Sequence, residues 1–407
     1  MPLTKVSFSV IQVANNVTST TVGNTTSIPS FTFDQNGVIT SASNTAISGA
    51  GITANTIANS AFQTGSVERY LLGANLDFGM RNRIINGAMA IDQRNAGASV
   101  TPTTGQYTLD RWLIFAQQSS KFSVQQNAGS VTPPTGFKNY LGATSLSAYS
   151  IVSGDYFTIG QPVEGFNVAD LEFGTANAKT ITVSFWVRSS LTGTFGAGIT
   201  NSAYNRSYPF SYTINNANTW EFKTVTIPGD TSGTWLTNNG RGIELDFGIG
   251  VGSDNSGTAG SWQSGWKPSV TGATSIVGTN GATFYITGVQ LEEGSQATSF
   301  EYRHYGTELA LCQRYFEKVG FGDSNSRYPT SIAYAASSSE YVCSLVPFVV
   351  AKRTIPTIVD GTVNLSQATS SIDGPSIQGF RFCVTATSSG TYGGSYVTSG
   401  VTASAEL

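Results

Sequence analysis

The sequence predicts an all-β protein, and two observations support that prediction. Charged residues make up only 11% of the 407 residues, and glycine occurs 45 times, whereas ordinary domains carry about 25% charged residues. Glycine, asparagine and serine supply the tight turns between short strands. Apolar and polar residues also alternate in several short runs, which is the period of a strand. We therefore expect an antiparallel sandwich of jelly-roll type.

The chain length favours several units, because one core commonly serves about 100 to 200 residues. Shifts in composition and pattern suggest where these units begin and end. We expect an N-terminal attachment segment at 1–45, an elongated shaft or trimerisation repeat at 46–77, the jelly roll at 78–303, a connecting helix at 304–320 and a smaller C-terminal β tip at 321–407.

Two patterns characterise the N-terminal part. The run "SFTFDQNGVITSAS" alternates around an "NG" dipeptide, which predicts a β-hairpin. Beyond it, apolar residues recur every five positions, at Ile47, Ile52, Ile57, Phe62, Val67 and Leu72. A period of five fits neither a helix nor a strand, so several chains wound together, or stacked short units, would be needed to bury this row. The alternative is a linker with spaced apolar residues.

The middle of the chain shows the strand period most clearly. "TITVSFWVRSS" places Ile181, Val183, Phe185 and Val187 on one face and Trp186 and Arg188 on the other. "RGIELDFGIGVG" places Ile243, Leu245, Phe247 and Ile249 opposite Glu244 and Asp246. A helix is expected at 308–318, with Thr307 as its N-cap and Leu309, Cys312 and Phe316 as its apolar stripe.

Several motifs resemble the distal part of bacteriophage tail fibres. They are "RNRIINGAMAIDQRNAG", "YTLDRW", "VSFWVRSS", "TWEFKTVTIPGD", "ITGVQLEEGSQATSFEYR", "YGTELALCQRYFEK" and the final "ASAEL". The resemblance covers roughly residues 78–320 and the last few residues. It implies a carbohydrate-binding-like jelly roll in a homotrimer on the virion, joined to other tail proteins through its N-terminus after synthesis in the host cytoplasm. The expected partner is host surface polysaccharide.

Sugar sites pair aromatic platforms with a few polar groups. Trp235, Trp262 and Trp266 are candidates because they lie in segments rich in Gly, Ser and Asn. Trp186 and Arg188 would form one groove with Glu244 and Asp246 if both strand faces lined the concave side of the sandwich. In a trimer that surface would instead be a subunit contact.

The tip offers a further candidate in "TSSGTYGGSYVTSG", a predicted loop. Its tyrosines, serines and glycines match the composition of adaptable recognition loops. Tyr392 and Tyr396 are therefore the expected receptor contacts. The alternative is an ordinary glycine-rich turn.

Catalysis, metals and cofactors are not expected, and contact with a sugar hydroxyl or a calcium ion is the alternative for Glu244 and Asp246. Glu244 and Asp246 lie about 7 Å apart along a strand, but any solvated strand carries such pairs, and Glu292 and Glu293 point to opposite faces. One histidine, His304, accompanies no nucleophile motif. The widely spaced Cys312, Cys343 and Cys383 fit neither metal-ligand nor disulfide patterns, so we expect them to be reduced and buried.

Charge and hydropathy argue against nucleic acid as a partner and against a membrane-spanning segment. A net charge of −3 without clustered cations argues against nucleic acid. The longest apolar run after the N-terminus, "LVPFVVA", is far shorter than the roughly 20 residues of a membrane span. The expected function is therefore adhesion without bond cleavage. A polysaccharide-degrading tailspike and a purely structural head or capsid fibre remain as alternatives.

Overall fold

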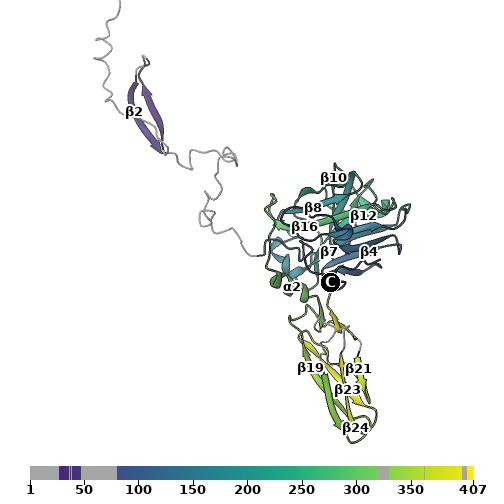
Figure 1. Cartoon of the computed structure of the whole chain (residues 1–407). Helices are drawn as coiled ribbons and strands as arrows, with labels where there is room; N and C mark the ends of the chain where they lie inside the picture. The colour runs from purple at the N-terminus through teal and green to yellow at the C-terminus, as the bar shows by residue number, and fades with distance from the viewer. Residues whose placement is uncertain are drawn as a thin grey trace, which may run out of the picture. The chain divides into compact units, whose positions relative to one another are not determined.

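The computed structural model describes residues 27–35, 37, 39–46, 80–319, 330–361, 363–396 and 401–407 (Figure 1). The chain divides into two units, 1–77 and 78–407. In the first unit, β1 (Ser27–Phe33) and β2 (Ile39–Ala46) form an antiparallel hairpin. Gly37 has a φ of 79°, which a glycine adopts readily in such a turn. The predicted hairpin is confirmed, whereas the five-residue repeat from Ile47 to Leu72 lies outside the described residues.

The second unit contains a sandwich of two antiparallel sheets. A seven-stranded sheet has the order β14-β10-β9-β12-β7-β4-β3, and a five-stranded sheet has the order β11-β8-β16-β6-β5. The strands of the larger sheet are β3 (Gln106–Leu109), β4 (Trp112–Ala116), β7 (Tyr156–Glu164), β9 (Gly193–Asn201), β10 (Arg206–Ile214), β12 (Arg241–Val251) and β14 (Gln263–Ser264). Those of the smaller sheet are β5 (Phe122–Gln126), β6 (Leu141–Ser145), β8 (Ile181–Ser189), β11 (Glu221–Ile227) and β16 (Thr283–Glu293).

Short elements complete the connections of the sandwich. They are the 3₁₀ turns η4 (Ala128–Ser130), η5 (Gly165–Asn167), η6 (Ala169–Leu171) and η7 (Ser253–Asn255), and the parallel pair β13 (Ser256–Gly257) and β15 (Ser269–Val270). Among the described residues, no helix is long and apolar enough to cross a bilayer.

The two sheets share one core, as the alternating pattern predicts. The apolar faces of β8 and β12 are fully buried between them. Phe185 of β8 and Phe247 of β12 meet edge to face, with ring centroids 4.9 Å apart. The predicted all-β sandwich of jelly-roll type is therefore confirmed.

The helix differs from its predicted bounds. α2 runs from Tyr305 to Gln313, with His304 at the N-cap position and no side-chain cap. It ends early because Phe316–Val319 form β17, which pairs with β25 (Val401–Ser404). Cys312 is buried as expected, but Phe316 belongs to a strand instead of the helical stripe.

The C-terminal tip is built from β strands around its own core. One sheet, β17-β25-β20 (β20, Thr357–Val359), connects it to the sandwich. The other two sheets are β18-β24-β21 and β19-β23-β22. Their bounds are β18 (Thr330–Ala335), β19 (Tyr341–Pro347), β21 (Val363–Ser366), β22 (Ala368–Asp373), β23 (Gly379–Ala386) and β24 (Gly390–Tyr396). Much of the predicted recognition loop is therefore strand β24.

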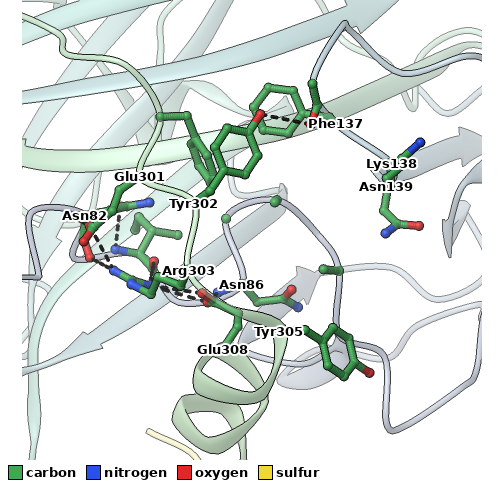
Figure 2. Close-up of a pocket in the computed structure, with 16 residues that line it drawn as sticks. Asn82, Asn86, Phe137, Lys138, Asn139, Glu301, Tyr302, Arg303, Tyr305 and Glu308 are labelled. Carbon is green, nitrogen blue, oxygen red and sulfur yellow. Dashed lines mark hydrogen bonds and ion pairs between the residues drawn. The ribbon is translucent and has the colours of Figure 1, made fainter.

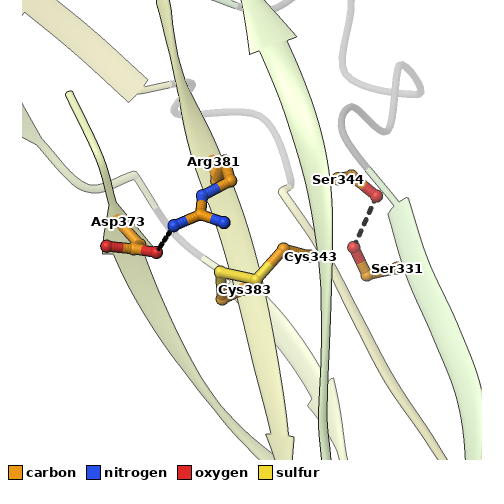
Figure 3. Close-up of a disulfide and its surroundings, with 6 residues drawn as sticks. All are labelled: Ser331, Cys343, Ser344, Asp373, Arg381 and Cys383. Carbon is orange, nitrogen blue, oxygen red and sulfur yellow. Dashed lines mark hydrogen bonds and ion pairs between the residues drawn. A yellow bond between two sulfur atoms is a disulfide. The ribbon is translucent and has the colours of Figure 1, made fainter. Parts of the chain in front are cut away.

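The prediction of three reduced cysteines was wrong. Cys343 and Cys383 form a disulfide across the β19–β23 pair, as Figure 3 shows. The two cysteines lie directly opposite each other in the strand register, with Cα atoms 4.0 Å apart. Their separation of 40 residues gave no indication of this pairing, because register depends on tertiary structure.

Unfolding the oxidised protein without reductant is expected to expose one reactive thiol per chain, from Cys312. Burial raises the pKa of this thiol well above its usual value, so the folded protein should react slowly. A thiol-specific chromogenic reagent in denaturant measures the count. The Cys312→Ala variant should then show none, and three thiols in the unreduced wild type would contradict the disulfide.

Candidate functional site

Two hollows lie at and beside the outer face of the five-stranded sheet. Side chains of β8 alternate, so Trp186 and Arg188 point away from the core that buries Phe185 and Val187. Phe137, from the connection before β6, and residues 297–302, after β16, lie over this face. The site is thus assembled from the sheet and two connecting segments.

Three aromatic side chains, Phe137, Phe300 and Tyr302, form what we call the aromatic ridge. The ring centroids of Phe137 lie 5.1 Å from Phe300 and 5.5 Å from Tyr302. Phe300 and Tyr302 are 4.9 Å apart. The Tyr302 hydroxyl donates a hydrogen bond to Gly136 O at 3.1 Å. These contacts therefore hold the Tyr302 ring in place, although Tyr302 is largely exposed to solvent.

The absence of a side chain at Gly288 leaves room for Phe137 against the sheet. Gly288 lies at the irregularity between Thr287 and Gln290 in the β16–β8 register and has a φ of 60°. A Cβ there would approach Phe137 Cζ to 2.6 Å. A side chain at this position would therefore push Phe137 away from the sheet.

The outer hollow lies on one side of the ridge and has a volume of about 570 Å³. Ligand pockets commonly measure about 300 to 1,000 Å³. Trp186 and Phe222 form its aromatic floor, with ring centroids 5.4 Å apart. Ser184, Thr298 and Ser299 add hydroxyl groups to its lining. Aromatic faces beside hydroxyl groups suit the apolar faces and polar edges of a sugar.

The inner hollow lies on the other side of the ridge and has a volume of about 210 Å³ (Figure 2). Lys138 and Asn139 are polar residues of its lining. Asn82 and Asn86 also line it, but their side-chain amides are buried and bond to the backbone. Both hollows are lined by all three ridge residues. The ridge is therefore a shared wall, and a ligand longer than one sugar unit would contact it from both sides.

The acids of the inner hollow have structural partners. Glu301 accepts a hydrogen bond from the Asn82 backbone N–H at 2.6 Å, and Glu308 accepts one from the Asn86 backbone N–H. Arg303 forms ion pairs with both carboxylates, at 3.5 and 3.4 Å. Figure 2 shows these contacts converging on Arg303. Their carboxylates hold the wall of the hollow in place, and no group of three potential metal ligands occurs among the described residues.

Of the predicted site residues, the structure places Trp186 in the outer hollow. Arg188 lies on the same sheet face, where its Nε donates to Asn218 O at 2.9 Å. Its guanidinium lies 5.5 Å from the ring centroid of Tyr285. Arg188 does not line either hollow, so it belongs to the surroundings of the site.

The predicted single groove was wrong. Glu244 and Asp246 point away from the core on the seven-stranded sheet, so they lie on the opposite outer face of the sandwich from Trp186 and Arg188. Both carboxyl groups are fully buried. They are not a solvated pair, because Trp266 and Tyr204 pack over them and donate hydrogen bonds to them.

Two predicted tryptophan platforms are packing residues. Trp235 is 8% exposed and meets Phe173 at 5.0 Å and Trp262 at 5.5 Å. Trp262 packs against the main core, and its Nε1 donates to Pro228 O at 2.8 Å. The glycine-rich composition around them misled the prediction, since both rings fold back onto the sandwich.

The predicted receptor contact at Tyr392 was also wrong. This side chain is buried in the core of the tip, opposite Ala333 in the β24–β18 pair. The side chain of Tyr396 lies outside the described part of the chain. A strand at this position turns alternate residues inward, so a tyrosine that looked adaptable in the sequence became part of a core.

Sequence reasoning missed Phe137, Phe222, Phe300 and Tyr302. A signal was present in "SFEYR", where Phe300 and Tyr302 are two residues apart and would share a face of an extended chain. For Phe137, no local pattern indicates that it lies beside residues 300–302. That proximity depends on the fold.

No protein-family model and no curated protein matches the sequence. Among solved structures, similarity is found to the enzymatically active domain of tailspike protein 4 of bacteriophage CBA120, with a TM-score of 0.29 and 12% identity over 53% of this chain. The matched region spans 22% of that tailspike chain.

Two carbohydrate-binding modules are also similar. One is a family 61 module solved with β-1,4-galactotriose, with a TM-score of 0.26 and 13% identity over 53% of this chain and 99% of the module. The other is the family 11 module of Clostridium thermocellum solved with a mixed-linked tetrasaccharide, with a TM-score of 0.25 and 13% identity over 50% and 98%. At these scores the site must be judged on its own geometry.

Proposed function

We propose that this protein is a carbohydrate-binding adhesin of a bacteriophage tail fibre that recognises host surface glycan. The observation that supports it best is the aromatic ridge with a hollow on each side, on the outer face of the five-stranded sheet. Aromatic walls beside hydroxyl and amide groups are suited to sugar rings. The tail-fibre motifs in the sequence support the same function.

The proposed role requires no bond cleavage. Glycoside hydrolysis generally needs two carboxyl groups on either side of the scissile bond. In the inner hollow, Glu301 and Glu308 are both held by backbone N–H groups and by Arg303. Both carboxyl groups are thus engaged with structural partners, whereas a general acid must be free to give its proton to the substrate. Binding is therefore the better interpretation of this site.

Two assays test the function. Purified protein should bind glycans on an array prepared from host polysaccharide and should compete with phage particles for adsorption to host cells. A negative result in both would favour a purely structural fibre. Incubation with the same polysaccharide should release no reducing ends, and steady release would establish a degrading tailspike instead.

The proposed adhesin is a homotrimer that attaches to the virion through its N-terminal part. In the tip, β18 and β19 are edge strands that expose apolar side chains. Ile332, Tyr334, Tyr341 and Leu345 are 68% to 73% exposed. Exposed apolar side chains gathered on neighbouring strands favour association with another chain. Several weak glycan contacts would then act together through multivalency.

The full-length protein is therefore expected to have a mass of three times the chain mass of 42.8 kDa. Light scattering during size-exclusion chromatography measures this directly. The Tyr341→Asp and Leu345→Asp double variant should shift the population towards smaller species, because it places charges on an exposed apolar edge. A monomeric wild-type mass at micromolar concentration would contradict the trimer.

A further inference from the structure

A second cluster of polar side chains lies on the opposite side of the sandwich, where Glu244 and Asp246 occupy adjacent outward positions of β12. Both residues are completely buried. Asp246 lies opposite Gly160 of β7, and a Cβ on that glycine would approach Asp246 Oδ1 to 2.3 Å. The lack of a side chain at Gly160 therefore leaves room for the carboxyl group.

The hydrogen bonds around the pair leave one oxygen without a conventional donor. Asp246 accepts from Thr158 Oγ1 at 3.2 Å and from Trp266 Nε1 at 3.3 Å. Glu244 Oε2 accepts from the Tyr204 hydroxyl at 3.1 Å and forms an ion pair with Arg241. Glu244 Oε1 is buried and has no donor among the described residues. The two carboxyl groups lie on the same face of β12, because residues i and i+2 of a strand point to the same side.

Two neighbouring carboxyl groups that are both completely buried favour a shared proton. Ionised carboxyl groups only accept hydrogen bonds, so two of them can bond to each other only when one is protonated. Charge balance leads to the same conclusion, because Arg241 pairs with Glu244, and Asp246 has no ion pair among the described residues. If both were ionised, one buried negative charge would remain uncompensated, which is unfavourable in a dry interior.

The other charged and titratable groups on the surrounding elements do not supply a second counter-charge. Lys267 donates its Nζ to Asp254 O at 2.6 Å, and Arg111 is paired with Glu406. Tyr107 is half-buried, and its pKa is raised by burial and then by Glu406. Glu164 of β7, opposite Arg241 in the strand register, is paired with Arg314. Tyr156 and Tyr204 contribute aromatic rings.

The direction of the pKa shifts agrees with this geometry. Burial raises the pKa of Glu244 to about 7, although Arg241 opposes the shift. Burial and then the charge of Glu244 raise the pKa of Asp246 well above its usual value. The two groups titrate as a pair.

Four half-buried aromatic residues, which we call the aromatic cap, cover the pair. Trp266 lies at its centre, with ring centroids 5.5 Å from Phe115, 5.0 Å from Tyr156 and 5.7 Å from Tyr204. All these contacts are edge to face. Trp266 connects the buried Asp246 with the surface, because its ring is partly exposed while its Nε1 bonds to the carboxyl group.

We propose that Glu244 and Asp246 share one proton and that its loss loosens the aromatic cap around Trp266, so that this face of the sandwich responds to pH. When the shared proton is lost, the second carboxylate must be stabilised by water or by a new counter-charge. Water can reach this carboxylate through the partly exposed aromatic cap. The pair would then keep the cap closed in mildly acidic solution and relax it as the pH rises.

The sign of the stability change follows from proton linkage. Because folding raises the pKa values, the folded state binds more protons than the unfolded state between the ordinary carboxyl range and about pH 7. The contribution of the shared proton to the free energy of unfolding is therefore largest at the acidic end of that window. It is lost as the pH rises towards 7. The Asp246→Asn variant keeps the size of the side chain and cannot ionise, and its amide oxygen can accept one of the two hydrogen bonds, from Thr158 or from Trp266.

The test compares wild type with Asp246→Asn at several pH values between 5 and 8. The ratio of their unfolding equilibrium constants should change by about tenfold or more in favour of the variant as the pH rises. Tryptophan emission of the folded wild type should shift with a midpoint near pH 7. That shift should be absent in Asp246→Asn and in Trp266→Phe.

Two outcomes would overturn the proposal. A pH-independent stability ratio would mean that the pair does not exchange a proton in this range. An emission change that persists in Trp266→Phe would mean that the cap is not what moves. If Asp246→Asn does not fold, Glu244→Gln provides the same comparison, because its amide can donate to Asp246 in place of the proton.

Discussion

Replacing Glu406 with glutamine is expected to lower the free energy of unfolding by about 3 to 5 kcal/mol, the usual effect of removing one partner of a buried ion pair. Glu406 forms ion pairs with Arg94 and Arg111 of the sandwich. The side chains of Arg111 and Glu406 are only 1% and 7% exposed. Glutamine keeps the size of the side chain but leaves a buried guanidinium without its counter-charge.

The aromatic surroundings of these arginines increase the expected effect. The Arg111 guanidinium lies 3.7 Å from the ring centroid of Tyr315, and Arg94 lies 3.7 Å from that of Phe316. Although burial alone lowers the pKa of Arg111, Glu406 reverses the shift, so this arginine stays charged. The cation cannot be neutralised when its partner is removed, and the full cost falls on the folded state.

An exposed ion pair in the same protein provides the control. Asp373 and Arg381 form an ion pair on the outer side of the tip, visible in Figure 3, and are 52% and 54% exposed. The Asp373→Asn variant is expected to lose less than about 1 kcal/mol. Urea unfolding followed by tryptophan emission measures both variants. Equal losses in the two would contradict a special role for the Glu406 network.

This network also explains how the tip joins the sandwich. Segments that are distant in the sequence meet there: Arg314 donates to Glu164 of β7, and Arg353 donates to the backbone of Ala405 and Asn239. Lys352 forms a buried ion pair with Glu317. The sequence predicted a joint near this position, in the form of a helix, but not the charges that fix it.

The sequence was most informative where a pattern is local. The alternation of Ile181, Val183 and Phe185 depends only on neighbours in one strand, and the structure buries these residues as predicted. The "NG" dipeptide at Gly37 likewise predicted its hairpin. These features required no knowledge of which strands pair.

Predictions failed where burial depends on a second segment. Alternation places Glu244 opposite the core, but it does not reveal that Trp266 and Tyr204 cover that side. Composition suggested an accessible Tyr392, whereas the β18–β24–β21 sheet turns it inward. The Cys343–Cys383 disulfide was missed for the same reason, since the strand register brings its sulfur atoms together.

Replacing Tyr302 with alanine is expected to weaken glycan binding by about tenfold to a hundredfold, which rests on the proposed function. Removing one aromatic contact forfeits roughly 1.5 to 3 kcal/mol of apolar burial, and each 1.4 kcal/mol is a factor of ten in affinity. Tyr302 lines both hollows, so a ligand in either would lose a contact. Titration calorimetry with a glycan identified on the array measures the change.

Two further variants serve as controls. One tests whether the Tyr302 ring or its hydroxyl group contributes to glycan binding, and the other tests whether loss of any exposed aromatic residue has the same effect. Tyr302→Phe removes only the hydrogen bond to Gly136 O and should bind within a few fold of wild type. Phe166→Ala should leave binding unchanged, because Phe166 is 60% exposed, like Tyr302 at 59%, but lines neither hollow. Equal losses in Phe166→Ala and Tyr302→Ala would place the glycan elsewhere.

Comparison with Trp186→Ala then identifies the hollow that contributes more. Trp186 lines only the outer hollow, and Asn139 lines only the inner one. A chain that spans the ridge should lose affinity in Trp186→Ala, in Asn139→Ala and most strongly in Tyr302→Ala. A ligand confined to the outer hollow should be unaffected by Asn139→Ala. Because both hollows share the ridge, Tyr302→Ala should weaken binding of a ligand that spans the ridge and of a ligand confined to the outer hollow. Comparison of Trp186→Ala with Asn139→Ala distinguishes these two binding modes.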